Sequence, residues 1–259
     1  MKQYKIAIVG SGIIGMTCAL HLAKLNNIQI TLYGKFPKHS EYKTTAILKT
    51  SFNLLKQIID IHEDDKTIQK LKKFKIIDQI SNRKKILDFD SSELDIDTFA
   101  YNIKDSLLSD KLINQIKKSK NIIHTNEFIR SINTNLQEVI IDYEGKKNYH
   151  DLVIAADGRN SIVRKQNQLS VERLKYEENI LITQITHSKH HDNTSYEIHR
   201  NGSLLTSVPI EDNISAIVYI DKPEIISKKS VKILNDYFNE SLGSYLGHIE
   251  TDENHDVFP

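Results

Sequence analysis

A glycine-rich turn near the N-terminus constrains the fold of this chain more than any other feature. Gly10, Gly12 and Gly15 lie close together in the sequence GSGIIG, although the whole chain of 259 residues has only nine glycines. An apolar run at 4–9 precedes the turn, apolar residues at helical spacing follow it, and a second apolar run occupies 28–33. A strand, a turn, a helix and a strand within about 30 residues predict a βαβ unit with a parallel sheet.

The spacing of the three glycines is typical of a dinucleotide-binding turn. Gly10 would allow the tight turn out of the strand, Gly12 would let the backbone approach a pyrophosphate, and Gly15 would let the helix pack closely on the sheet. The backbone N–H groups of Ile13 and Ile14 would then lie at the helix N-terminus, where the dipole favours a phosphate. The turn therefore predicts a dinucleotide site.

The position that usually fixes the adenosine ribose departs from this pattern. In dinucleotide-binding folds an Asp or Glu about 20 residues further along accepts hydrogen bonds from the ribose hydroxyls. Here that position is Gly34, and Lys35 follows it. A neutral residue beside a lysine suits a 2′-phosphate and so favours an NADP-dependent oxidoreductase without flavin. The alternative is a weakened ribose contact at a site that still binds through its phosphates.

A second polar motif follows the predicted strand at 149–156. Asp157 and Gly158 come directly after this strand, and Arg164 follows a short polar turn. A carboxylate, backbone donors and a cation could together surround a pyrophosphate. The structural alternative is a helix start capped by Ser161 or its neighbouring asparagine.

The rest of the chain divides into a mixed part and a sheet-rich part. Helical periodicity predicts helices at 47–59 and 98–118, and strands are expected between 122 and 156. The C-terminal third consists of predicted strands, and a helix at roughly 227–241 follows them. The pattern predicts an α/β nucleotide-binding half joined to a sheet-rich half, with the segment near 70–97 crossing into the second.

Together, VGSGIIG and IAADGRNSIVR resemble the FAD-dependent aromatic monooxygenases related to p-hydroxybenzoate hydroxylase. YKTTAIL is similar to a segment that lies near the flavin in this family, and FAYNIKDSLLSDKL resembles its ubiquinone-biosynthesis hydroxylases. The resemblance implies a Rossmann-like FAD-binding domain at 1–70 and 96–172, with a parallel sheet. It also implies a sheet-rich substrate domain at 71–95 and 173–259, with an incomplete C-terminus.

By this resemblance the chain would be an FAD-dependent monooxygenase that uses NAD(P)H and O₂ to hydroxylate an aromatic, polyprenylated ubiquinone precursor. Lys43 would lie at a phosphate near the flavin, and Asn102 would lie near the ribityl chain. Asp157, Gly158 and Arg164 would supply a second flavin contact and the docking of NAD(P)H. No catalytic acid or base is expected from the protein, because the flavin performs the difficult chemistry.

The sequence also departs from the family pattern. Gly34 replaces the ribose-binding acid, and Lys43 stands where the family has an arginine, which keeps the charge but loses the bidentate fork. The family's later Gly-Asp flavin motif does not occur before the chain ends at Pro259. A degenerate or split flavoprotein that binds FAD weakly is therefore the alternative to a working enzyme.

Composition bears on the remaining partners. The formal net charge of +1 argues against nucleic acid, and the basic stretch at 66–85 is followed by an acidic one at 88–97, so both are expected to form a solvated face. The single Cys18 and the lack of an apolar stretch of roughly 18 residues favour a cytoplasmic protein without a membrane span. The resemblance adds peripheral contact with the inner membrane and partner subunits of a ubiquinone-biosynthesis complex.

A cluster of histidines raises the question of a metal site. Imidazoles that converge from a strand pair could bind zinc, but these lie across a strand–turn–strand with no nearby cysteine and no helical pair. A polar turn is expected there, and no metal. The histidines concerned are His187, His190, His191 and His199.

Overall fold

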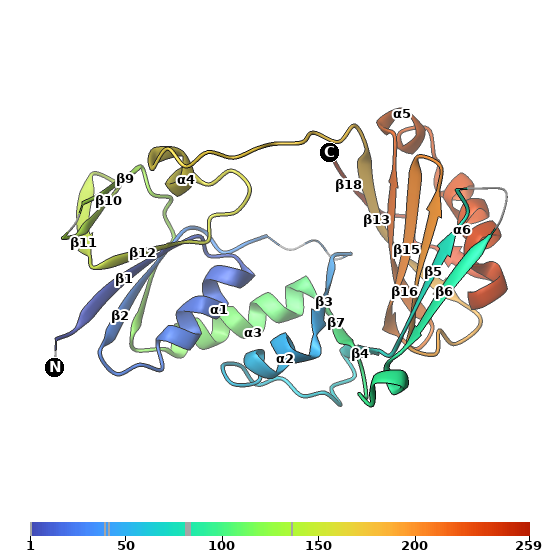
Figure 1. The fold of residues 1–259 in the computed structure, drawn as a ribbon, viewed down its shortest axis with the longest axis horizontal. Coiled ribbons are helices and arrows are strands. Elements are labelled where there is room, and N and C mark those ends of the chain that lie inside the picture. Colours follow the sequence, from blue (N-terminus) through green and yellow to red (C-terminus); the bar gives the residue numbers. More distant parts are fainter. Residues whose placement is uncertain (1, 39, 41, 81–83, 136) are drawn as a thin grey trace. The chain divides into compact units, whose positions relative to one another are not determined.

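The computed structural model describes residues 2–38, 40, 42–80, 84–135 and 137–259 (Figure 1). The chain divides into two compact units, each discontinuous in sequence. Unit 1 comprises Met1–Lys38, Leu55–Asp60 and Leu107–Leu174. Unit 2 comprises His39–Leu54, Ile61–Ser106 and Lys175–Pro259. The expected domain limits stay a prediction.

The predicted βαβ unit forms the centre of unit 1. Strand β1 (Tyr4–Val9) pairs in parallel with β2 (Ile28–Tyr33) and β12 (Leu152–Ala155), and β2 pairs in parallel with β8 (Ile122–Thr125). The order is therefore β12-β1-β2-β8, and helix α1 (Ile13–Leu22) connects β1 to β2. Four consecutive residues are buried at the end of both β1 and β2, which explains why these strands read as continuous apolar runs.

An antiparallel sheet packs on one face of this parallel sheet. It has the order β11-β10-β9, and its apolar side chains form a core with Ala7, Val9 and Tyr33 of the parallel sheet. Figure 1 shows α1 and α3 along the opposite side. The bounds are β9 (Ser131–Thr134), β10 (Val139–Tyr143), β11 (Lys146–His150), α3 (Asp105–Lys118) and α4 (Ile162–Gln166).

A large mixed sheet dominates unit 2. Its strand order is β17-β13-β16-β15-β14-β5-β6, and β18 also pairs with β13. Strand β5 joins it in parallel with β14, so the segment near 70–97 does enter the sheet-rich part. The bounds are β5 (Lys73–Asp78), β6 (Lys85–Asp90), β13 (Asn179–His187), β14 (Thr194–Arg200), β15 (Ser203–Glu211), β16 (Ile214–Asp221), β17 (Ile249–Thr251) and β18 (Asp256–Phe258).

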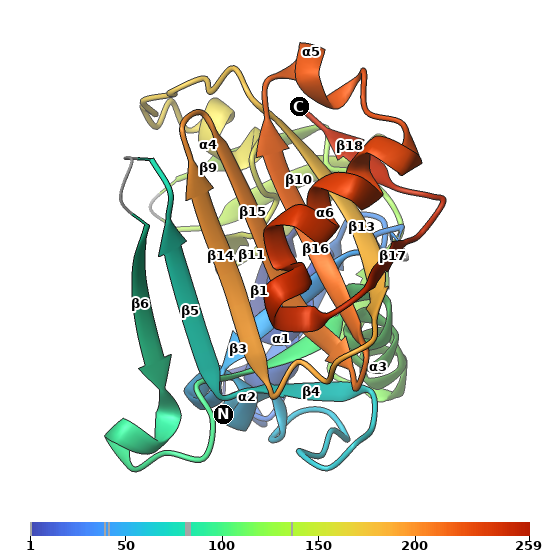
Figure 2. The same ribbon diagram turned by 90° about the vertical axis from the view of Figure 1, so that its right-hand side faces the viewer.

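Helix α6 (Val231–Leu246) lies across one face of the large sheet (Figure 2). Phe238, Leu242 and Leu246 are fully buried there among alternate residues of the strands, which is the core of unit 2. The expected C-terminal helix is therefore present, a few residues later than predicted. A short helix α5 (Pro223–Ile226) precedes α6, and the 3-10 turn η1 (Ser91–Leu94) follows β6.

A smaller antiparallel sheet in unit 2 differs from the sequence expectation. It has the order β3-β7-β4, formed by β3 (Thr44–Leu48), β7 (Ala100–Lys104) and β4 (Ile68–Leu71). The expected helices at 47–59 and 98–118 are therefore shorter, and only α2 (Lys49–Leu55) and α3 remain. Residues 47–48 and 100–104 only approximate a helical pattern, and they form strands because they pair with each other across a long stretch of sequence.

The basic and acidic stretches oppose one another in the hairpin of β5 and β6. The Nζ atom of Lys73 lies 3.6 Å from the Asp90 carboxylate, and that of Lys75 lies 3.2 Å from Asp88. Residues 81–83 of the basic stretch lie outside the described residues. The hairpin thus neutralises part of its own charge.

No helix in the described part of the chain has the length and apolarity needed to cross a membrane.

Candidate functional site

The carboxyl ends of the parallel strands bring several predicted site residues to one edge of unit 1. The Gly10 N–H donates to the Tyr33 carbonyl at 2.8 Å, and the Gly34 N–H donates to the Thr125 carbonyl at 3.1 Å. Asp157 follows the end of β12 at the same edge, next to Gly10. Ligands of open α/β sheets bind beyond this edge, so these residues lie where a dinucleotide would be held.

Two of the three turn glycines are required by packing. Gly10 has a φ of +109°, and a Cβ atom added to it would lie 2.2 Å from the Ala156 carbonyl oxygen. A Cβ atom at Gly15 would lie 1.8 Å from the Gly10 carbonyl oxygen. Any side chain at either position would therefore push the turn away from β12 or lift α1 from the turn.

Gly12 differs from both neighbours. It is the N-cap of α1 with a φ of −74°, and within the described chain no heavy atom lies within 4 Å of an added Cβ. No side chain caps the first turn, and Ile14 is 74% exposed. The first N–H groups of α1, including those of Ile13 and Ile14, have no partner within the helix, and the space beside Gly12 is open among the described residues. Binding of a pyrophosphate there stays a prediction.

Two residues that sequence reasoning missed converge on Gly34. The Ser11 hydroxyl donates to the Gly34 carbonyl at 2.8 Å, and the His124 Nε2 atom lies 2.8 Å from the same oxygen. The ring of Phe36 stacks on that of His124, with centroids 3.9 Å apart and an interplanar angle of 15°. The only sequence signal for His124 is its place at the end of a predicted strand, β8, which pairs in parallel with β2.

Gly34 and Lys35 occupy the expected ribose end of the site. Gly34 has a φ of +120°, so the backbone there suits glycine and strains any residue with a side chain. The exposed Lys35 places its Nζ atom 5.7 Å from the centroid of the Phe128 ring. Its ammonium group is therefore available to solvent at this edge.

Asp157 caps the start of α4. Its Oδ2 atom accepts hydrogen bonds from the N–H groups of Ile162 at 2.7 Å and Val163 at 3.2 Å. The Ser161 hydroxyl accepts from the Arg164 N–H at 3.0 Å. The helix start thus has both the serine cap considered as the structural alternative and a carboxylate, so a flavin contact of Asp157 stays a prediction.

The remaining residues of the second motif lie in the same turn. Gly158 has a φ of +76° and directs the chain away from the end of β12. The Arg164 guanidinium donates to the Arg159 carbonyl at 2.6 Å. One end of the guanidinium is therefore held by the backbone, and its role toward a nucleotide is untested.

Lys43 and Asn102 belong to unit 2. The Lys43 Nζ atom lies 3.5 Å from the Asp105 carboxylate, and its side chain is 56% exposed. Asn102 on β7 donates to the Pro209 carbonyl at 2.8 Å, while its buried Oδ1 atom has no partner among the described residues. The position of both residues relative to the glycine turn is not determined (Figure 1).

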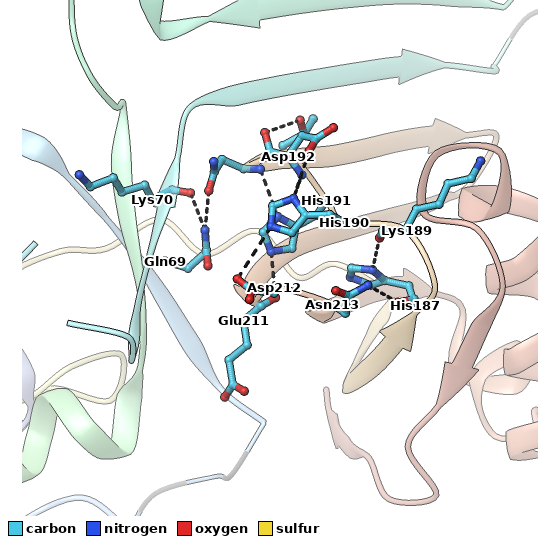
Figure 3. Close-up of polar contacts among 12 residues, drawn as sticks. Gln69, Lys70, His187, Lys189, His190, His191, Asp192, Glu211, Asp212 and Asn213 are labelled. Carbon is cyan, nitrogen blue, oxygen red and sulfur yellow. Dashed lines mark hydrogen bonds and ion pairs between the residues drawn. The ribbon is translucent and has the colours of Figure 1, made fainter. Parts of the chain in front are cut away.

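Figure 3 shows the histidines at the end of β13 held by backbone groups. His187 donates from Nδ1 to the Lys189 carbonyl at 2.7 Å, and its Nε2 atom lies 3.0 Å from the Ser215 hydroxyl. His191 donates from Nε2 to the Glu211 carbonyl at 2.8 Å and accepts from the Asn193 N–H at 3.1 Å.

Both of these rings are buried, and burial lowers the pKa of each, that of His191 to about 4. His190 lies 3.1 Å from Asp192, and His199 lies 2.6 Å from Glu197. Across the described ranges no group of three or more His, Cys, Asp or Glu side chains is placed to hold a metal ion. His190 and His191 lie in the connection between β13 and β14, and His187 and His199 lie on these two strands.

Unit 2 also contains an apolar cavity of about 300 Å³ on the β5–β6–β14 side of its large sheet. Its walls include the rings of Phe74, Phe89 and Phe99, and its few polar groups include Ser195 and Glu197. Ile76 and Lys75 complete the lining, so three phenylalanines and one isoleucine face three polar or charged side chains. Apolar walls with a few polar groups suit a small aromatic molecule.

Several solved structures share the fold of this chain. PqsL from Pseudomonas aeruginosa, described as a probable FAD-dependent monooxygenase, superposes with a TM-score of 0.75 at 13% identity, covering 100% of this chain and 73% of that one. The p-nitrophenol 4-monooxygenase of Pseudomonas putida DLL-E4 superposes with a TM-score of 0.69 at 16% identity, covering 100% and 68%. The chain therefore shares its α/β fold, with a Rossmann-like parallel sheet and a sheet-rich second part, with these two monooxygenases.

Among curated proteins the chain is similar to a particular enzyme of this class. It is 25% identical over 240 residues to the mitochondrial ubiquinone biosynthesis monooxygenase COQ6 of Drosophila melanogaster, covering 84% of this chain and 49% of the relative. The COQ6 of Dictyostelium discoideum is 23% identical over 212 residues, covering 70% and 42%. The chain spans about half the length of the curated relatives it matches, and no family model matches it. The resemblance predicted from the sequence is confirmed.

Proposed function

We propose that this chain binds FAD and acts as an FAD-dependent monooxygenase on an aromatic substrate. The observation that carries the proposal is the open N-terminus of α1 at Gly12, at the carboxyl edge of a parallel sheet, in the fold of FAD-dependent monooxygenases. Backbone N–H groups and the helix dipole together favour a pyrophosphate at this point.

The proposed cofactor-binding residues come from both nucleotide motifs, from Gly34 and Lys35, and from Lys43 and Asn102 of unit 2. FAD, when bound and reduced by NAD(P)H, would supply the chemistry that transfers one oxygen atom of O₂ to an aromatic ring. The protein would therefore contribute binding, orientation and exclusion of water. The residues proposed to bind it are Gly10, Gly12, Ile13, Ile14, Gly15, Gly34, Lys35, Lys43, Asn102, Asp157, Gly158 and Arg164.

We infer that the substrate is a polyprenylated aromatic precursor of ubiquinone. The similarity to COQ6 supports this choice, and the phenylalanine-lined cavity of unit 2 offers walls of matching chemistry. The use of NAD(P)H, peripheral contact with the inner membrane, and partner subunits of a ubiquinone-biosynthesis complex are further parts of this proposal, and they rest on the resemblance in sequence alone.

Two other functions are each favoured by a specific observation. Residue 34 is a glycine where the ribose-binding acid is usual, and the neighbouring Lys35 is exposed. These two features favour an NADP-dependent oxidoreductase without flavin. Asp157 caps α4 and Lys43 contacts Asp105, so two groups expected at the flavin already have protein partners, which favours a degenerate or split flavoprotein with weak FAD binding.

A titration of the purified chain with FAD, followed by flavin absorbance and calorimetry, tests the proposal. The wild-type chain is expected to bind FAD, and Gly12→Val is expected to weaken binding at least about tenfold, because its side chain fills the space before α1. Gly243→Ala in α6, where an added Cβ also meets no described atom within 4 Å, is the matched control and should bind as wild type.

The alternatives give different results in the same experiment. Binding of NADPH but not FAD would support the flavin-free oxidoreductase. Weak FAD binding that Gly12→Val leaves unchanged would contradict the proposed pyrophosphate site and support the degenerate flavoprotein.

A further inference from the structure

The hydrogen bond between His124 and Gly34 fixes which ring nitrogen carries the proton. A carbonyl oxygen only accepts hydrogen bonds, so the Nε2 atom, 2.8 Å from the Gly34 oxygen, must be the donor. In the neutral imidazole the Nδ1 atom is then an acceptor. Among the described residues this Nδ1 atom has no hydrogen-bond partner.

The ring is held in place from two sides. Its Nε2 atom is tied to β2 through Gly34, and its face stacks on Phe36 at a centroid distance of 3.9 Å. His124 is itself only partly buried, so a ligand can reach the ring. All these contacts lie within unit 1, at the end of β2 where the ribose-binding acid is missing.

The chain does not hold a carboxylate at residue 34 in its present backbone conformation. The φ of +120° strains any L side chain there, and an added Cβ would lie 3.4 Å from the Ser11 nitrogen. An acceptor for the ribose hydroxyls must therefore come from a neighbouring strand. Ser11 and His124 are the described side chains bonded to the Gly34 carbonyl, and because Ser11 is buried, the partly buried His124 is the one of the two that offers an unused acceptor to a ligand.

We propose that His124 replaces the missing acid and accepts a hydrogen bond from a ribose hydroxyl of the bound adenosine. The inference rests on the proposed dinucleotide site. A hydroxyl can donate to Nδ1, whereas a fully ionised 2′-phosphate has no proton to give, so the neutral ring selects an unmodified ribose. His124 is thus a specificity-determining residue that opposes the attraction of Lys35 for a 2′-phosphate.

The test compares the calorimetric affinities of ADP, 2′-deoxy-ADP and 3′-deoxy-ADP. Wild type is expected to bind ADP about fivefold more tightly than one of the deoxy analogues, the usual effect of one hydrogen bond. His124→Phe keeps an aromatic ring for the stack on Phe36 but has no acceptor, so it should bind ADP and both analogues equally. His190→Gln, a partly exposed histidine of unit 2, is the control and should keep the preference.

Three outcomes would overturn the inference. His124→Phe could keep the preference for ADP, or it could weaken all three ligands equally, as a purely structural residue would. Wild type could also bind FAD without any preference among the ADP analogues. A chain that prefers ADP but neither binds flavin nor hydroxylates an aromatic ring would support His124 while contradicting the proposed function.

Discussion

Each unit holds a buried histidine with hydrogen-bond partners that fix its place. In unit 1 the Tyr33 hydroxyl and His150 Nε2 form a hydrogen bond of 2.9 Å, and in unit 2 the Asn193 N–H donates to His191 Nδ1 at 3.1 Å. Burial lowers the pKa of both imidazoles to about 4 and raises the pKa of Tyr33 to about 12. Protonation of His191 would remove the acceptor that the Asn193 N–H uses.

We therefore expect the stability to fall in acid. His191 has a pKa of about 4 in the folded chain and 6.5 as an ordinary histidine, so the unfolded chain binds more protons between these values. Its contribution is fully present above pH 6.5 and is lost as the pH falls toward 4. The free energy of unfolding should decrease by on the order of 3 kcal/mol for this group.

Urea unfolding at a series of pH values checks this expectation. His191→Gln can keep the donor to Glu211 but cannot titrate, so its pH dependence should be shallower than that of wild type. An equal slope in both proteins would mean that His191 does not control the acid response. The exposed pair of His190 and Asp192 allows His190→Gln to serve as the control, with an unchanged slope.

The sequence predicts the structural role of some residues and not of others. Gly10 and Gly15 were predictable because their spacing reflects packing within one short turn. Ser11 and His124 bond the Gly34 carbonyl from 23 and 90 residues away, and no local pattern encodes such a contact. The sequence also predicts a helix start capped by Ser161 in the second motif, and Ser161 does cap α4.

At the scale of elements, the second polar motif caps the helix that follows it, α4. Asp157 accepts from two N–H groups of its first turn, and Ser161 accepts from a third. Removal of either cap is expected to lower the free energy of unfolding by about 1 kcal/mol. A comparison of Asp157→Ala with Ser161→Ala in urea unfolding measures these losses.

The same pair of variants separates capping from cofactor binding. If Asp157 also contacts the flavin, Asp157→Ala should reduce FAD affinity more than Ser161→Ala does at a similar loss of stability. Equal FAD affinities in the two variants would assign Asp157 to the helix alone.

The elements that were predicted wrongly share one physical cause. Residues 47–48 and 100–104 have apolar residues near helical spacing, but they pair as β3 and β7 through register contacts such as Ile47 with Tyr101. The strands of β1, β2 and β13 to β16 were predicted correctly because their burial is continuous or alternates with a period of two. Periodicity therefore predicts an element correctly where the burial pattern can be read within that element's own residues.

At the scale of the whole molecule, each unit has a hydrophobic core of its own. Ile132, Ile141 and Val163 belong to the core of unit 1, and Leu181, Phe238 and Leu242 belong to that of unit 2. A ligand that binds only to unit 1 should therefore stabilise the two units unequally.

Hydrogen exchange with and without ADP tests this expectation. At a free ADP concentration about 100 times Kd, binding should stabilise the folded state of unit 1 by about 2.7 kcal/mol. The amides of β1, α1 and β2 should exchange more slowly, while those of α6 in unit 2 should change little. Equal slowing in α6 would show that the chain opens as one cooperative body.

Gly12 has a consequence for the history of such proteins. Folding needs Gly10 and Gly15, but a side chain at Gly12 meets open space and an ordinary φ of −74°. A lineage that stopped using its dinucleotide could therefore replace Gly12 freely while the other two glycines were retained. Among the descendants of a common ancestor, the residue at this position would record whether the cofactor is still in use.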